Sequence, residues 1–330
     1  KMVGEMAWDG RHLDVNEFTY ELTDTDIEEV ESGLAEFKAH ELDGPDVTSE
    51  TFPLPSLGLK LDHFSHSVHN GNGLVMIRGL NPGKYSSEDN AIIFLGISSY
   101  IGSERGMQDN CGNMMGNIQY VIPQTRLIGS VLILQQRFHS DNYCDVVALL
   151  IRSTPLAGGA IHVASSWDIY NTLSLRRPKD VEELMSPHWK FESRGDLFPG
   201  CTRQLLYIHG GKVILSFSPR PLLGSQTRGT HDVLGNLTKA QSVAMQAVQD
   251  LGDERSIKIH PRPGDMIFLN NHSMLHARES FMDGSDHTRH IMRLWLRNPS
   301  LAWSLPDELE AGRKRVYGEN GLVEHWELEP

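Results

Sequence analysis

The sequence predicts a mainly β protein with flanking helices, built on a double-stranded β-helix (jelly-roll) core. Many short β-branched and apolar runs, separated by turns rich in Gly, Asn and Pro, have the length and composition of strands. Fewer segments show the apolar spacing of helices. The chain has 330 residues, which is enough to bury a large core, and residues 1–330 are expected to form a single domain.

The N-terminal part, about residues 1–70, is expected to be a helical cover. Thr25 and Glu28 have the spacing of a capping box, which would begin an acidic amphipathic helix over residues 26–40. The next elements expected are a helix at 57–69, a strand at 74–77 and a helix at 88–101.

The jelly-roll core is expected over about residues 71–300, and the tail 301–330 is expected to be a peripheral cover. The strands predicted in this core are 117–121, 131–134, 146–151, 205–208, 213–217, 266–269 and 289–297. Helices are expected at 167–175, 179–184 and 239–251, the last with Thr238 as its N-cap.

One tripeptide has the spacing of a metal site. His139-Ser140-Asp141 follows one apolar run and precedes another, so it lies at the end of a predicted strand. Because strand side chains alternate, His139 and Asp141 would project from the same face. Together with the distant His276 they form a two-His, one-carboxylate set, which holds non-heme Fe(II) and leaves positions open for a 2-oxo acid and for dioxygen.

Two arginines follow His276 along the chain. In the strand predicted over 289–297, Arg289 and Arg293 share one face and can point into the same cavity. A guanidinium is a planar fork that matches a carboxylate, so Arg289 is a candidate to bind the far carboxylate of the 2-oxo acid. The alternative for Arg293 is a solvated strand face.

Four stretches resemble the taurine dioxygenase and clavaminate synthase-like superfamily of Fe(II)/2-oxoglutarate-dependent oxygenases, in style closest to its fungal gamma-butyrobetaine-hydroxylase-like branch. They are "GNGLVMIRGL" (71–80), "FHSDNYCDVVALL" (138–150), "LAGGAIHVASSWDIYNTL" (156–173) and "LNNHSMLHARESF" through "RHIMRLWLR" (269–297). They occur in the order typical of the family, over roughly residues 50–300. The resemblance implies that His139, Asp141 and His276 bind iron and that Arg289 holds 2-oxoglutarate.

The sequence departs from this family at one position. Relatives often carry Thr or Ser two residues after the Gly-Gly pair, where its hydroxyl bonds the co-substrate, but here the residue is Ile161. His162 or Ser165 is a candidate to replace that hydroxyl.

The resemblance implies an oxidoreductase that uses Fe(II), 2-oxoglutarate and O2 and releases succinate and CO2. Its expected reaction is the oxidation of an unactivated C–H bond, giving hydroxylation, desaturation or oxidative cyclisation. In related enzymes an Arg matching Arg293 can meet a substrate carboxylate, so a small, carboxylate-bearing, amino-acid-like substrate is expected. Asn117, Gln119 and Gln136 are further candidates for substrate hydrogen bonds, although each residue type is more often solvated or bonded to backbone.

Composition excludes several other classes of partner. The net charge of −13 argues against nucleic acid and anionic membranes, both of which need clustered Lys and Arg. No apolar run is long enough to span a membrane, and the first residues lack a signal-peptide core. The three cysteines are widely spaced, which favours a reducing cytoplasm. The sequence does not indicate an oligomeric state.

Two alternatives remain open at this stage. The same three donors bind zinc in some hydrolases, although the sequence has no HExxH motif and such a site would leave Arg289 without a role. A jelly-roll protein that binds a ligand without turnover is the second alternative, but it would need neither the three donors nor the arginine.

Overall fold

The computed structural model describes residues 1–119, 131–223 and 237–328. Within these residues, two sheets face each other. The major sheet has the order β1 (Thr19–Glu21), β2 (Leu74–Arg78), β15 (Met266–Asn270), β7 (Val146–Ser153), β18 (His290–Arg297) and β3 (Glu104–Arg105), and β4 (Gly116–Gln119) also pairs with β18. The minor sheet has the order β14 (Ile257–Ile259), β9 (Ile161–Ser165), β16 (Met274–Arg278) and β6 (Gln136–His139).

Smaller strand groups extend this arrangement. A three-stranded sheet has the order β5 (Val131–Ile133), β17 (Phe281–Asp283) and β8 (Ala157–Gly158). Two hairpins pair β10 (Trp189–Phe191) with β11 (Cys201–Arg203) and β12 (Leu206–His209) with β13 (Lys212–Leu215). The second of these is the hairpin predicted across Gly210-Gly211.

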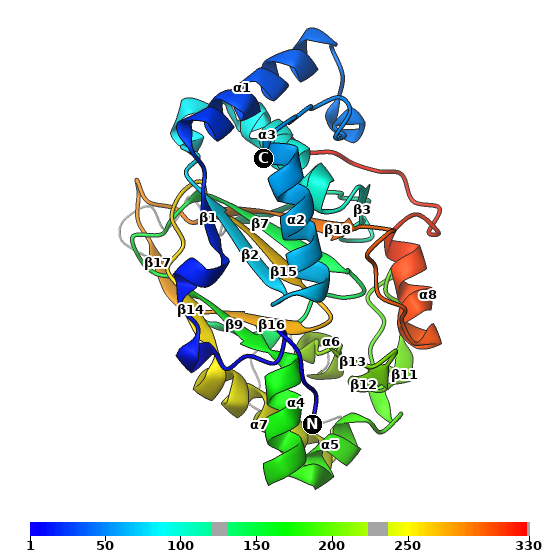
Figure 1. The fold of residues 1–330 in the computed structure, drawn as a ribbon. Coiled ribbons are helices and arrows are strands. Elements are labelled where there is room, and N and C mark those ends of the chain that lie inside the picture. The colour runs from blue at the N-terminus through cyan, green and yellow to red at the C-terminus, as the bar shows by residue number, and fades with distance from the viewer. Residues whose placement is uncertain (120–130, 224–236, 329–330) are drawn as a thin grey trace.

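Helices cover the two outer sides of the sheet assembly (Figure 1). Helices α1 (Asp24–Ala39), α2 (Leu57–Asn70) and α3 (Ser87–Ile101) lie on the side of the major sheet, and α4 (Ser166–Arg176), α5 (Pro178–Leu184) and α7 (Lys239–Arg255) lie on the side of the minor sheet. The remaining helices are α6 (Pro219–Leu223), α8 (Asp307–Val316) and the 3-10 turns Gly10–His12, Val15–Phe18, Gly44–Asp46 and Pro82–Lys84. Among the described residues, none of the helices has both the length and the apolar character required to cross a bilayer.

Alternate residues of the major sheet divide between two hydrophobic clusters. In β18, Ile291 and Trp295 belong to the cluster shared with the minor sheet, whereas Met292 and Leu294 pack with the cluster under helices α1–α3. This division follows the period of two of a strand. We call the side of the major sheet that bears Ile291 and Trp295 its inner face.

Helix α1 begins two residues earlier than predicted. Its capping box is formed by Thr23 and Asp26 rather than by Thr25 and Glu28. An aspartate at the third helical position can make the same reciprocal bonds, and Asp26 is also held by Tyr20 and Lys60 from other elements, so tertiary contacts select it. The cap of α7 at Thr238 is as predicted.

Two other expectations are only partly met. The strand predicted over 117–121 is β4, and residues 120–121 lie outside the described residues. The tail is more than a peripheral cover, because α8 packs beside the loop between β6 and β7. Gly312 leaves room for the ring of Tyr143, and Arg313 Nη1 lies 3.4 Å from Asp145 Oδ2.

Candidate metal centre and substrate cavity

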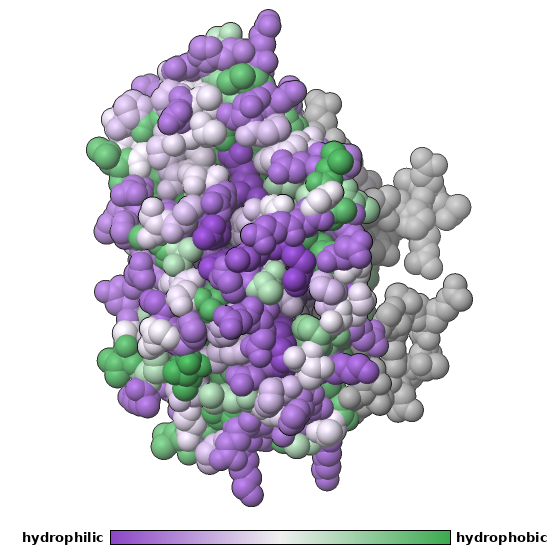
Figure 2. Space-filling view, turned by 90° about the vertical axis from the view of Figure 1, so that its right-hand side faces the viewer, coloured by the Kyte–Doolittle hydropathy of each residue, from purple (hydrophilic) through white to green (hydrophobic). Residues whose placement is uncertain are grey.

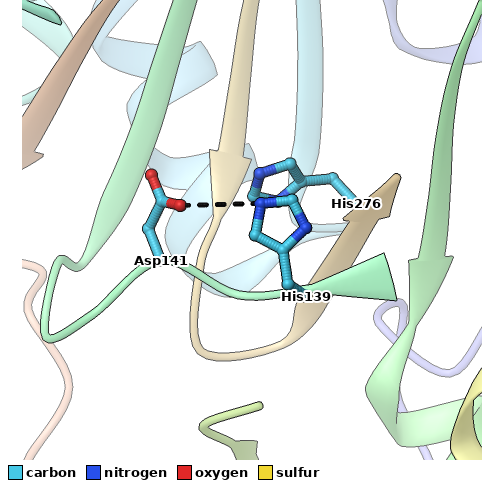
Figure 3. Close-up of side chains that lie close together, drawn as sticks. All are labelled: His139, Asp141 and His276. Atoms are coloured by element: carbon cyan, nitrogen blue, oxygen red, sulfur yellow. Dashed lines mark ion pairs between the residues drawn. The ribbon is translucent and has the colours of Figure 1, made fainter. Parts of the chain in front are cut away.

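His139, Asp141 and His276 come together as the sequence predicts. One donor atom from each residue lies within 4.8 Å of the others. His139 ends β6, Asp141 follows it in the loop, and His276 lies directly opposite His139 on β16. Figure 3 shows the two imidazoles and the carboxylate converging on one region. Antiparallel pairing of β6 with β16 therefore joins the two halves of the motif.

Hydrogen bonding determines which nitrogen of His139 carries the proton. Its Nδ1 lies 2.9 Å from the carbonyl oxygen of Arg137. Only a protonated nitrogen can donate to a carbonyl, so Nε2 carries the lone pair. Burial lowers the pKa of His139, and burial together with the adjacent His139 ring lowers the pKa of His276 to about 3. Both rings are therefore neutral at neutral pH, as metal ligation requires.

The two oxygens of Asp141 have different neighbours. Oδ2 accepts hydrogen bonds from Arg293 Nη1 at 2.9 Å and from Trp295 Nε1 at 2.7 Å. Oδ1 lies 3.8 Å from His139 Nε2. Burial acts to raise the pKa of Asp141, but Arg293 and the two imidazoles outweigh it and lower that pKa to about 2. With Oδ2 occupied, Oδ1 is the oxygen free to bind a metal.

The loop that carries Asp141 is fixed by residues that the sequence did not single out. Asn271 accepts from Asp141 N at 2.8 Å and donates to the carbonyls of Asp141 and Cys144. Ser140 exchanges backbone and side-chain hydrogen bonds with Phe217. These bonds hold the carboxylate in place before any ligand binds. In the sequence, the one feature that could have pointed to this role is that Asn271 directly follows β15.

Arg289 is buried, and Asp283 is close enough to act on its charge. Its side chain is 7% exposed, and its guanidinium forms no hydrogen bond or ion pair with any residue in the described ranges. The guanidinium carbon lies 5.2 Å from the centre of the Phe281 ring. Burial, with repulsion from Arg278, lowers the pKa of Arg289 to about 10, so it remains a cation at neutral pH. A buried unpaired cation is costly, and an anionic ligand would offset that cost.

Only some of the predicted substrate residues line the cavity. Arg293 and Gln136 line a cavity beside the metal cluster, and Gln136 Nε2 lies 2.9 Å from His139 Nε2. Asn117 pairs in register with Met292, on the face opposite Arg293, and bonds His290. The expectation that Asn117 borders the pocket is therefore wrong, because the register of β4 turns it away. Gln119 pairs with His290 and lies on that same outer face.

Neither proposed substitute for the hydroxyl missing at Ile161 is available. Ile161 is opposite Arg278 in register and shares a face with His276. His162 therefore projects from the other face of β9, where it bonds Ser256 and Glu279. Ser165 donates to the carbonyl of Met6.

The cavity beside the metal cluster has a volume of about 370 Å³ and reaches the protein surface. Its lining includes His139, Asp141, Gln136, Arg293, Phe198 and Trp295. The face of the protein that bears α8 is predominantly hydrophilic, with apolar side chains in small groups (Figure 2). The indole N–H of Trp295 reaches Asp141. The sequence could have indicated this contact, because Trp295 lies two residues after Arg293 and so on the same face of the strand.

Comparison with known families identifies the chain. Residues 25–295 match the family described as Taurine catabolism dioxygenase TauD, TfdA. The chain belongs to the TauD, TfdA family. It is therefore an oxidoreductase of the dioxygenase class, as the sequence predicts.

The chain is also similar to individual proteins of known name. The chain is 34% identical to the taurine hydroxylase-like protein SAT17 of Stachybotrys chartarum, over 100% of this chain and 89% of that protein. It is 22% identical to FR-33289 synthase of Streptomyces rubellomurinus, over 89% of this chain and 90% of that protein.

Solved structures of two oxygenases share the fold. Asparagine oxygenase matches with a TM-score of 0.63 and 17% identity, over 87% of this chain and 99% of its own. The non-heme iron oxygenase OrfP matches with a TM-score of 0.60 and 16% identity, over 88% and 97%. The predicted jelly-roll fold class is thereby confirmed.

Proposed function

We propose that this protein is an Fe(II)- and 2-oxoglutarate-dependent dioxygenase that oxidises an unactivated C–H bond of a small, carboxylate-bearing, amino-acid-like molecule. The observation that carries the proposal is the convergence of His139, Asp141 and His276 in a member of a dioxygenase family. The product would be hydroxylated, desaturated or cyclised, with succinate and CO2 released. The free state of Cys111, Cys144 and Cys201 supports the predicted cytoplasmic location.

The donor set fits a ferrous ion. Two neutral imidazole nitrogens and one carboxylate oxygen are the ligands that non-heme iron takes when it must keep positions open. Arg293 and Trp295 occupy Asp141 Oδ2, which favours binding through a single oxygen. The ion would supply the redox chemistry that couples oxidative decarboxylation of 2-oxoglutarate to oxidation of the substrate.

The burial of Arg289 supports its role in holding the co-substrate. It directly precedes β18, and its guanidinium forms no hydrogen bond or ion pair with a described residue. The distal carboxylate of 2-oxoglutarate is the anion we assign to it. OrfP has been crystallised with Fe and alpha-ketoglutaric acid, which supports the same pair of ligands here.

The substrate class rests on the relatives and on the polar cavity. Asparagine oxygenase and OrfP have been crystallised with hydroxylated asparagine and with arginine derivatives, respectively, so an amino-acid-like substrate fits a shared fold. Gln136 lines the cavity, with its amide nitrogen 2.9 Å from His139 Nε2. Arg293 also lines the cavity, but its guanidinium is bonded to Asp141 Oδ2. It could therefore contact a substrate carboxylate only while it keeps that bond.

Anaerobic titration tests the proposed function. Addition of Fe(II) and then 2-oxoglutarate should produce a weak visible charge-transfer band. His139→Ala or Asp141→Ala should abolish the band, whereas Arg289→Gln should mainly weaken the affinity for 2-oxoglutarate, by about tenfold or more. Arg176→Gln, at an exposed arginine of α4, is the matched control and should change neither.

The same titration separates the two alternatives. A zinc hydrolase or a non-catalytic binding protein would give no band with Fe(II) and 2-oxoglutarate. Failure of the wild-type protein to form the band would therefore overturn the proposed function. Family membership already favours a dioxygenase over both.

A further inference from the structure

The cavity beside the metal cluster has a charge opposite to that of the whole chain. Its lining contains four arginines, Arg137, Arg194, Arg220 and Arg293, and one acidic residue, Asp141. The chain as a whole carries a net charge of −13. A concave site lined by one sign of charge concentrates ligands of the other sign. The cavity is therefore suited to an anion.

Two of these arginines are already engaged. Arg293 is bonded to Asp141 Oδ2 and to Gln108 Oε1, at 2.9 and 2.8 Å. Arg137 donates to Gln246 Oε1 at 3.1 Å. The charge of Arg293 is largely neutralised by Asp141, and moving it to a substrate would free an oxygen of a proposed metal ligand. Neither residue is the best anchor for a second anion.

Arg194 and Arg220 are exposed and available. Neither guanidinium forms a hydrogen bond or an ion pair with residues 1–119, 131–223 or 237–328. Both residues line the cavity beside the metal cluster.

We propose that Arg194 and Arg220 form the subsite for an oxyanion group of the substrate. The proposal rests on the proposed function and refines it, because it places the anionic end of the substrate at these two arginines and the reacting carbon toward the metal cluster. Planar guanidinium groups match carboxylate, sulfonate and phosphonate oxygens alike. Arg293 then positions Asp141 and does not anchor the substrate.

The test measures binding of simple probes to the anaerobic Fe(II) protein with saturating 2-oxoglutarate, which occupies the site assigned to Arg289. Butyrate, propane-1-sulfonate and propylphosphonate are compared with neutral butyramide and cationic propylamine by calorimetry. The anions should bind in preference to the other two. Arg194→Gln and Arg220→Gln should each weaken anion binding by about tenfold, the effect of losing one charge-assisted hydrogen bond. Both variants should leave the dissociation constant of 2-oxoglutarate unchanged.

The control variant is Arg176→Gln, which removes an exposed arginine outside the cavity and should bind the anions as the wild type does. Anion binding that survives both cavity substitutions, binding that does not distinguish anions from butyramide, or no anion binding at all would overturn the subsite. If 2-oxoglutarate still gives its charge-transfer band in those cases, the proposed function stands and only the subsite fails. The relative order of the three anions identifies which oxyanion the subsite prefers.

Discussion

Trp295 donates its indole N–H to Asp141 Oδ2 at 2.7 Å, from a strand that lies more than a hundred residues further along the chain. The indole is 3% exposed, so this hydrogen bond is shielded from water. Outer partners of this kind orient a metal-binding carboxylate and tune its affinity. Trp295 is therefore a positioning residue for the proposed metal site.

Trp295→Phe should lower the affinity for Fe(II) by about tenfold or more while keeping the fold, because it removes the N–H and preserves an aromatic ring. Metal titration with circular dichroism as a check on folding measures this. Trp303→Phe is the matched control, since that equally buried indole bonds the carbonyl of His69. Equal metal affinity in the two variants would show that the bond to Asp141 has no such role.

Arg293→Gln should also weaken metal binding, because it removes the ion pair that holds Asp141 Oδ2. Breaking one partner of a buried pair leaves the other uncompensated. The readouts are the dissociation constants of Fe(II) and of the anionic probes, measured separately. If metal affinity stays at the wild-type value and only anion binding falls, Arg293 contacts substrate after all.

Ile161→Thr tests the missing hydroxyl. Ile161 is 3% exposed and shares a face with His276, so the new hydroxyl would be buried. An unpaired buried hydroxyl costs about 1–3 kcal/mol, and bound 2-oxoglutarate would give it a partner. We expect Ile161→Thr to lower Tm in the absence of 2-oxoglutarate. When 2-oxoglutarate is added, Tm should rise more for Ile161→Thr than for Ile161→Val. Equal gains in the two variants would mean that the co-substrate does not reach this position.

Asp26→Asn tests the network that joins α1, α2 and β1. Burial acts to raise the pKa of Asp26, but Lys60, Tyr20 and Thr23 outweigh it and hold that pKa well below its usual value of 3.8. A carboxyl whose pKa is lower in the folded state stabilises the protein above its unfolded pKa and loses that effect as pH falls. The substitution should therefore cost about 2 kcal/mol of unfolding free energy at pH 7.

The difference in unfolding free energy between Asp26→Asn and wild type should become smaller as the pH drops below about 4, where the carboxyl of the unfolded chain becomes protonated. Urea denaturation at pH 7, 5 and 3 measures it. Asp24→Asn, at an exposed residue in the same turn, should show little effect at any pH. If the difference in unfolding free energy is the same at all three pH values, it does not arise from an ionised Asp26.

Elements governed by local pattern were predictable from the sequence. The strand predicted over 289–297 is present as β18, from His290 to Arg297, and the cap of α7 at Thr238 is present as expected. Asn117 was misplaced because its direction depends on the register of β4 against β18, which no local pattern encodes. The start of α1 was misplaced because Lys60, from another helix, favours Asp26.

The amino-acid sequence alone determined the set of donors and the strands that carry them, because motif spacing and side-chain alternation act over a few residues. Only the tertiary structure decided that Trp295 and Arg293 share one oxygen of Asp141, that Arg289 is buried, and that Arg194 and Arg220 line the cavity. Those relationships join residues far apart in the chain, so they exist only after the sheets have packed.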